Sequence, residues 1–396
     1  MTAGAGFPLA QDFIQYWGAF RIVLDGGNPY DAQVMQSLQL SMGRSPENIA
    51  MFWNPPWALI ILAPFLFFSY QTSAIVWVLV NCCLAVGTIA IARQIYLPKS
   101  ALSRSALLVS ALFFPLYENI FWGQISLLLA FIISSWLWAM HTKRYVLAGV
   151  LFSLLSIKPH LFHLLGVLFF FWSDRKNAMR FFLAAVASVV ALVFASYMLS
   201  PVACSHWVSG IDGTRNAGGV VSVYQWFTAT FPAYLRYLLW NGQGTPPTWP
   251  MWFVPMSSWL LLGAYLFIRK QPIDWKRDAA WVLGLSLFTS PYGWYYDQST
   301  LLFAWVALSG LVFNAPLRNI FRDPNWRVST KFWAPIVMIV TLLALWGMSI
   351  REGGAQHYYV WLPPLISILW LSVYTHRNSK FRFLWKQIGV IFGSCD

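Results

Sequence analysis

Apolar residues follow one another in long runs along this chain, and polar residues are confined to short segments between them. Residues 59–68, 75–92 and 335–348 are examples of such runs. Runs of this kind are typical of helices surrounded by lipid. The pattern predicts an all-α polytopic membrane protein that forms a single integral membrane domain over residues 1–396.

The amino-acid composition excludes a soluble globular protein. Hydrophobic residues make up 58% of the 396 positions and charged residues only 10%, whereas a soluble domain has about a quarter of its residues charged. The 24 Trp and 17 Tyr residues fit aromatic belts at two bilayer interfaces. The four cysteines, Cys82, Cys83, Cys204 and Cys395, form neither a disulfide framework nor a zinc-binding pattern.

The net charge of +13 has a regular distribution along the chain. Twenty of the 26 Lys and Arg residues fall in six short segments, namely 93–104, 143–144, 175–180, 269–277, 318–331 and 377–386. Under the positive-inside rule, such segments are cytoplasmic loops. The charge therefore reflects membrane topology, and we expect no nucleic-acid partner.

Each interval between two cytoplasmic loops has to leave the cytoplasm and return, so it forms a hairpin with an extracytoplasmic tip. The tips fall at residues 117–124, 158–163, 291–298 and 351–357, and a long extracytoplasmic loop covers residues 201–250. This topology contains about eleven transmembrane helices and places the C-terminus in the cytoplasm.

Residues 1–70 form the first extracytoplasmic segment of this topology. Pro55 and Pro56 open an apolar run that ends at residue 68 and is too short to span a bilayer, so we expect juxtamembrane helices here. An extracytoplasmic N-terminus normally follows a span or a signal, and residues 1–10 contain neither a basic region nor an apolar run. We therefore expect a further transmembrane helix before Met1.

Lys158 is the ionisable residue in the most costly position. It lies within the apolar stretch 145–172, followed at once by Pro159, His160 and His163, and no acidic residue is near it in the sequence. A charge near the bilayer centre costs about 2.5 to 3.5 kcal/mol. Either the ammonium extends along its own methylene chain to the outer interface, or it binds an anion. The adjacent histidines favour the anion.

Three predicted tips carry polar side chains between apolar arms. Asp297 follows a break at Pro291 and Gly293, and it either lines a cavity or belongs to an interfacial turn. The tip at residues 117–124 carries Glu118, Asn119 and Gln124, and the tip at residues 351–357 carries Arg351, Glu352 and His357. Glu118 is either solvated or functional. The Arg351 tip forms either an exposed ion pair or a second phosphate-binding site.

Asp12 precedes an amphipathic segment in which Phe13, Trp17 and Phe20 share one helical face. It is either the N-cap of this helix or a general base, because a single displacement requires one carboxylate beside the acceptor hydroxyl. Asp25 and Asp31 flank a Gly-Gly-Asn-Pro sequence and are expected to be turn residues.

Several motifs are absent from the sequence. It contains no GxxxxGK[ST] phosphate loop, no GxGxxG, no HExxH and no Asp-x-Asp pair. ATP-driven transport, zinc proteolysis and direct use of a nucleotide sugar are disfavoured, and we expect neither a cofactor nor a bound metal. A membrane-embedded site with one candidate base and several cations suits a substrate that carries a phosphate and a lipid tail.

Six segments, taken in order, resemble a known family. They are Asp12-Phe13-x-x-Tyr16-Trp17; Gly27-Asn28-Pro29-Tyr30-Asp31; Trp53-Asn54-Pro55-Pro56 with Ala63-Pro64-Phe65; Trp122-Gly123-Gln124-Ile125-Ser126-Leu127-Leu128; Ala148-Gly149 with Ile157-Lys158-Pro159; and Ser290-Pro291-Tyr292 with Asp297. The resemblance is to the polytopic glycosyltransferases of the GT-C superfamily, and most closely to glycosyltransferase family 87, the polyprenyl-phosphate-mannose-dependent mannosyltransferase-like group. The chain departs from the family pattern at Ser126, where Asn is frequent, and at Asp297, because the late tip of the family carries a histidine. The family's first transmembrane helix, normally directly before the Asp motif, is also absent.

The resemblance implies a GT-C-like bundle with an extracytoplasmic site in a bacterial plasma (inner) membrane. It implies inverting transfer of a sugar, by default mannose, from a polyprenyl-phosphate sugar donor to a glycan or glycolipid acceptor. By position, Asp12 is implied as the general base and Lys158 as the ligand of the leaving phosphate. Lesser phosphate candidates are His160, His163, Arg351 and His357, and implied substrate-binding residues are Tyr16, Asn119, Gln124, Tyr292 and Asp297.

The sequence leaves more than one possibility open for the acceptor-binding residues and for the class of function. Trp226 in the long loop either stacks on a sugar of the acceptor or lies on the membrane surface. The polar tips are also compatible with a transporter or flippase of a lipid-linked or anionic solute, although no internal repeat is visible. A third alternative is an inactive relative that serves as a scaffold.

Overall fold

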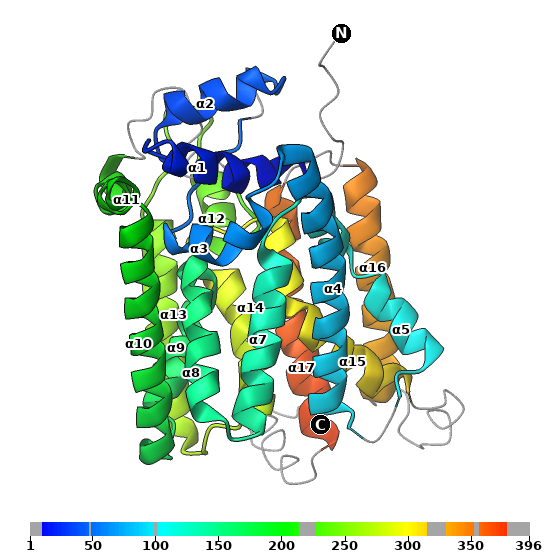
Figure 1. Ribbon diagram of the computed structural model, residues 1–396. Coiled ribbons are helices and arrows are strands. Elements are labelled where there is room, and N and C mark those ends of the chain that lie inside the picture. Colours follow the sequence, from blue (N-terminus) through cyan, green and yellow to red (C-terminus); the bar gives the residue numbers. More distant parts are fainter. Residues whose placement is uncertain are drawn as a thin grey trace.

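The computed structural model describes residues 10–46, 49–98, 101–213, 227–314, 330–351 and 356–377. Within these ranges all regular structure is helical (Figure 1). The all-α fold predicted from the sequence is confirmed.

The body of the molecule is a bundle of helices that run roughly along its long direction (Figure 1). These helices are α4 (Tyr70–Tyr96), α5 (Arg104–Ala111), α6 (Phe114–Trp122), α7 (Ser126–His141), α8 (Tyr145–Ser153), α9 (His163–Phe170), α10 (Arg175–Leu199), α13 (Pro250–Arg269), α14 (Trp275–Thr289), α15 (Leu302–Phe313), α16 (Thr330–Arg351) and α17 (Leu362–Arg377). Among them α15 is central: it packs against α4, α5 and α17, and its residues from Leu302 to Leu308 are fully buried.

Short helices cover one end of the bundle, the upper end in Figure 1. They include α1 (Ile14–Leu24), α2 (Ala32–Ser41), α3 (Trp57–Leu62), α11 (Pro201–Gly213) and α12 (Phe231–Leu239). The part of the chain that the structure describes also contains the 3-10 helices η1 (Gln11–Phe13), η3 (Ala63–Phe65), η4 (Leu154–Ile157), η5 (Pro159–Phe162), η7 (Tyr295–Leu301) and η10 (Gln356–Trp361).

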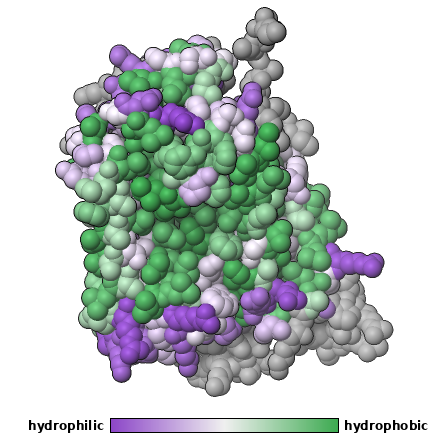
Figure 2. All heavy atoms as spheres, in the orientation of Figure 1, coloured by the Kyte–Doolittle hydropathy of each residue, from purple (hydrophilic) through white to green (hydrophobic). Residues whose placement is uncertain are grey.

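The outer surface of the bundle is apolar. In α10 only Phe181 and Ser196 are buried, and its exposed side chains include Phe182, Val190 and Phe194, each more than 60% exposed. A helix this apolar and this exposed is stable only in lipid. Figure 2 shows the same property on one face of the molecule, where a broad hydrophobic band separates two hydrophilic ends.

Within the described residues, three helices are long and apolar enough to cross a membrane: α4, α10 and α13. A fourth span is obtained if α5 and α6, which are bent by 45° relative to each other, count as one. The protein is therefore an all-α membrane protein. The charge pattern predicts about eleven crossings, which is more than the number of helices of spanning length among the described residues. Several of the predicted crossings are short apolar helices, such as α7 and the Tyr145–Ile157 segment.

The basic segments in the described part of the chain gather at one end of the bundle, which we call the basic end. Lys276 Nζ donates a hydrogen bond of 2.9 Å to the carbonyl of Ile95, and Tyr96 Oη donates one of 3.1 Å to the carbonyl of Lys276. The starts of α8 and α10 lie at this same lower end in Figure 1. We call the opposite end, covered by α1, α2 and α3, the site end.

Helix breaks occur where the sequence predicts tips. Gly123 separates α6 from α7, Lys158 separates η4 from η5, and residues 290–294 separate α14 from η7. The predicted loop 201–250 is partly helical, because it contains α11 and α12. Residues 214–226 of this loop, including Trp226, lie outside the described residues.

Candidate active site

The N-terminal segment is held closely against the α6–α7 turn. Gly123 adopts a left-handed conformation with φ of 71°, and Ala10 N donates a hydrogen bond of 2.7 Å to the carbonyl of Phe121. A Cβ atom on residue 123 would lie 2.6 Å from the Cα of Ala10. Glycine is therefore required here both by the backbone conformation and by the close approach of the two segments. This contact fixes η1, and with it Asp12, at the site end.

The carboxylate of Asp12 accepts hydrogen bonds from two side chains. Arg44 Nη2 lies 3.0 Å from Oδ1, and Gln124 Nε2 lies 3.0 Å from Oδ2. Arg44 also donates to the carbonyl of Gln11 through Nη1, and the side chain of Asp12 remains 21% exposed. The N-cap of α1 is Phe13, without a side-chain hydrogen bond. The N-cap alternative for Asp12 is thus wrong, because its carboxylate bonds to groups of other segments.

Gln124 is itself oriented by its neighbours. Tyr16 Oη donates a hydrogen bond of 3.1 Å to Gln124 Oε1, so the amide nitrogen of Gln124 faces Asp12. The fully buried Asn119 donates to the carbonyl of Gln124 at 3.0 Å and accepts from Leu127 N at 3.2 Å. Three residues selected from the sequence, Tyr16, Asn119 and Gln124, are therefore brought together around Asp12.

Lys158 forms a buried ion pair. Its Nζ lies 2.7 Å from Oδ1 of Asp297, and the two side chains are only 9% and 2% exposed. Asp297 also accepts hydrogen bonds from the hydroxyl of Ser126 and, at 3.0 Å, from Trp294 N. No acidic residue is near Lys158 in the sequence, but a carboxylate of the protein is its partner in the structure. The partner comes from the tip at 291–298, which is distant in the sequence and adjacent in the fold.

The α6–α7 turn connects the two carboxylates. Gln124 donates to Asp12, and Ser126, two positions later, donates to Asp297. Burial raises the pKa of Asp12 above its ordinary value of 3.8, and Arg44, Gln124 and Lys158 lower this pKa by a smaller amount. Because Gln124 and Ser126 belong to the same turn, Asp12 and the Lys158–Asp297 pair are parts of one site.

The two histidines after Lys158 have different surroundings. The ring of His160 lies 4.0 Å from the ring of Tyr292, so two residues selected from the sequence are in contact. His163 points elsewhere: its Nδ1 accepts a hydrogen bond of 2.6 Å from Trp259, and its Nε2 lies 3.2 Å from the carbonyl of Ser286. Both ring nitrogens of His163 are engaged within the bundle, which argues against a role of this residue in phosphate binding.

The last predicted tip is only partly described. His357 is buried, and its ring lies 4.4 Å from that of Tyr237 and 4.2 Å from that of Tyr358. Its helix, η10, is joined to η7 by a hydrogen bond of 2.9 Å from Gln298 to the carbonyl of Tyr359. Arg351 ends α16, and its side chain, like Glu352, lies outside the described residues.

Two residues of the site were not selected from the sequence. Arg44 is one of the few cations outside the basic segments, which was a usable signal, although nothing in its sequence surroundings connects it with Asp12. Ser126 is a departure from the family pattern, and its contact with Asp297 follows only from the fold.

Glu118 is not simply solvated, because Tyr295 Oη and Trp122 Nε1 donate hydrogen bonds of 2.6 and 2.9 Å to its carboxylate.

The sequence model of glycosyltransferase family 87 matches residues 52–291 of the chain. The chain belongs to glycosyltransferase family 87. The matched range includes Gln124, Ser126 and Lys158, whereas Asp12 and Asp297 lie outside it. No curated protein and no solved structure matches the chain.

Membership of glycosyltransferase family 87 makes this membrane protein a glycosyltransferase, with a sugar donor and an acceptor as its substrates. It also decides between the two function classes that the sequence left open, in favour of the transferase over the transporter. Among the described side chains, no three His, Cys, Asp or Glu residues are grouped so that they could hold a metal ion.

Proposed function

We propose that the protein transfers a sugar, by default mannose, from a polyprenyl-monophosphate donor to a hydroxyl group of a glycan or glycolipid. The transfer is an inverting single displacement, Asp12 is the general base, and Lys158 binds the phosphate of the donor. The observation that carries the proposal is the joint arrangement of Asp12 and the Lys158–Asp297 pair on either side of the α6–α7 turn. A base and a phosphate-binding cation are the two groups that this reaction requires.

The displacement involves one proton and two carbon–oxygen bonds. The acceptor hydroxyl oxygen attacks the anomeric carbon, and its proton passes to the carboxylate of Asp12. At the same time the bond between the anomeric carbon and the phosphate oxygen breaks, and its electron pair remains on the polyprenyl phosphate. Attack from the face opposite the leaving group inverts the anomeric configuration.

Asp12 is suited to the role of base because it is held in place and remains accessible. Hydrogen bonds from Arg44 and Gln124 fix both carboxylate oxygens, and each oxygen has a second lone pair for the acceptor hydroxyl. Burial raises the pKa of Asp12, which makes the carboxylate a stronger base than an ordinary aspartate.

Lys158 is suited to bind the leaving phosphate because its ammonium has three hydrogen atoms and the Asp297 pair uses one. Contact with the phosphate strengthens as negative charge develops on the leaving oxygen. His160, two positions after Lys158, and Tyr292, whose ring contacts that of His160, complete the donor side. His357 and Arg351 remain lesser candidates.

The topology follows from the charge distribution. We place the basic end in the cytoplasm, and the site end with its long loop 201–250 outside, in a bacterial plasma membrane with the C-terminus inside. In this arrangement the bundle is a single GT-C-like domain with about eleven crossings, of which the shorter are surrounded by other helices. The first extracytoplasmic segment, 1–70, then carries the base.

Transfer of radiolabel from polyprenyl-phosphate mannose, measured with purified protein in liposomes, tests the proposal. The matched control is a nucleotide-activated form of the same sugar. We expect label in a product from the lipid donor only, with inverted anomeric configuration in the product. Transfer from the nucleotide sugar and not from the lipid donor would contradict the proposal, as would a retained configuration.

A further inference from the structure

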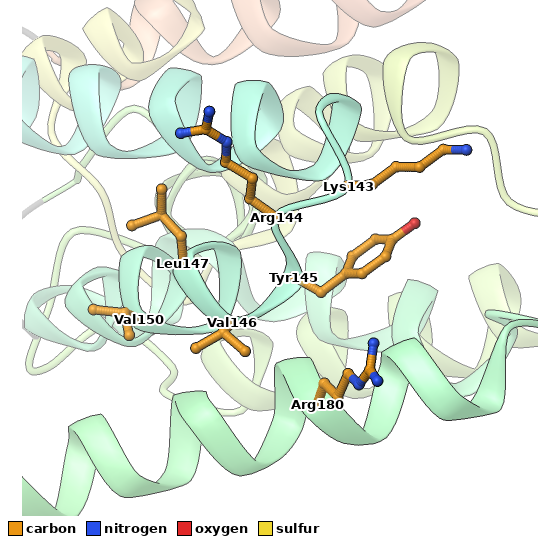
Figure 3. A pocket seen from close by; sticks show the side chains of 7 residues that line it. All are labelled: Lys143, Arg144, Tyr145, Val146, Leu147, Val150 and Arg180. Atoms are coloured by element: carbon orange, nitrogen blue, oxygen red, sulfur yellow. The ribbon is translucent and has the colours of Figure 1, made fainter.

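A groove lies between the first turns of α8 and α10 (Figure 3). These turns lie at the basic end, opposite the end that carries α1 (Figure 1). Its volume is about 560 Å³. Three cations, Lys143, Arg144 and Arg180, line it together with Tyr145. Figure 3 shows the side chain of Arg180 extending from α10 toward the start of α8, whereas Tyr145 extends away from Arg180, to the side of Lys143.

The three cations are exposed and only partly neutralised. None of them forms an ion pair with another described residue. Arg144 lies over the ring of Trp138 at 4.9 Å, and Arg180 donates a long hydrogen bond of 3.3 Å to Asn177. The nearby carboxylate of Asp174 caps α10 and accepts two hydrogen bonds from Asn177. The groove therefore has an excess of positive charge that an anion would balance.

The remaining lining of the groove is apolar. Val146, Leu147 and Val150 lie next to the cations on α8 and are 58%, 39% and 37% exposed. They continue from the basic end into the hydrophobic band that encloses the bundle. A soluble anion would use only the cations, whereas a phospholipid would use both parts, with its phosphate on the cations and an acyl chain along the valines.

We propose that this groove binds one anionic phospholipid of the leaflet at the basic end. The cations of the groove match the phosphate of the lipid, and its apolar side chains match an acyl chain. The site also lies where the headgroups of this leaflet are located. A cation near an anionic headgroup raises the affinity by about fivefold. The three cations together then prefer an anionic to a zwitterionic lipid by on the order of 100-fold. The site is independent of the donor site, because it depends on none of the residues around Asp12.

Native mass spectrometry of the purified protein tests this proposal. Wild-type protein is titrated with phosphatidylglycerol and with phosphatidylcholine of the same acyl chains. The test variant is K143Q/R144Q/R180Q. The matched control, R93Q/R104Q/K270Q, removes three exposed cations from the same end of the bundle without changing the groove.

We expect wild type and the control to retain one phosphatidylglycerol in strong preference to phosphatidylcholine, and the groove variant to lose this preference. If both variants lost the preference for phosphatidylglycerol equally, the proposal would be overturned. The preference would then depend on the total charge of the basic end and not on the groove. Glycerol phosphate, which lacks acyl chains, should bind at least tenfold more weakly. Equal binding of glycerol phosphate would overturn the assignment to a lipid.

Discussion

Lys158 and Asp297 lie 139 residues apart in the sequence, and their charged groups lie 2.7 Å apart in the structure. Each sits at a break between helices: Lys158 between η4 and η5, and Asp297 directly after the irregular segment 290–294. Irregular backbone is tolerated at membrane depth only where other parts of the protein cover it. The two breaks cover each other, and the two charges compensate each other.

The ion pair permits a test that separates stability from catalysis. K158M leaves the buried Asp297 carboxylate without its cation, which we expect to cost about 3 to 5 kcal/mol of stability. In K158M/D297N the amide oxygen of residue 297 can accept from Trp294 N, and its NH2 group can donate to the hydroxyl of Ser126. No buried charge remains, so most of the loss should be recovered. Thermal unfolding in detergent measures both effects.

Sugar transfer should remain low in both variants, because both lack the cation that binds the donor phosphate. If the double variant regained stability and also regained wild-type transfer, Lys158 would have a structural role only.

Arg44 controls the protonation of Asp12 in this account. The guanidinium lowers the pKa of Asp12, although burial keeps that pKa above 3.8. The base works only when it is deprotonated, so activity falls as the pH drops through the pKa. Removing the cation in R44Q should raise the pKa and move the acidic limb of the pH–rate profile to higher pH. R44K keeps the charge and should leave the limb close to that of wild type.

The pH–rate profile of transfer measures this shift, and R93Q at the basic end serves as a control that changes only distant charge. An unchanged limb in R44Q, with normal protein yield, would argue against Asp12 as the group that titrates.

Gly123 sets the position of Asp12 through the backbone. G123A introduces a side chain at φ of 71° and 2.6 Å from Ala10, so η1 has to move away from the α6–α7 turn. We expect transfer to fall by about 10²-fold, since catalysis tolerates little displacement of a base. The matched control is G263A, where an added Cβ meets no atom within 4 Å. Similar activity of G123A and wild type would contradict this role of the turn.

The helical class and the positions of the helix breaks followed from apolar runs and from Pro and Gly, because these features act locally. Asn119 and Gln124 lie at a predicted tip, and Tyr16 lies in the same motif as Asp12. That the tip meets this motif could not be predicted from the sequence. The pairing of Lys158 with Asp297 and of Arg44 with Asp12 depends on which tips meet in space. A hydropathy pattern carries no information on that point.

The two positions at which the sequence departs from its family pattern are in contact. Ser126 donates a hydrogen bond to Asp297, so a small hydroxyl on the α6–α7 turn accompanies a carboxylate on the late tip. The departures are thus two parts of one local arrangement, and each by itself gives no reason to regard the site as inactive.

The most direct test of the central claim is sugar transfer by D12N, compared with D31N in the same membranes. Asp31 caps α2 through Gln33 N and Val34 N, and Asn is an equally good cap, so D31N should transfer as wild type does. D12N keeps the shape of the side chain and loses the base, so transfer should fall by about 10²- to 10⁴-fold with donor binding and folding unchanged. Transfer by D12N at the rate of D31N would contradict the assignment of Asp12 as the general base.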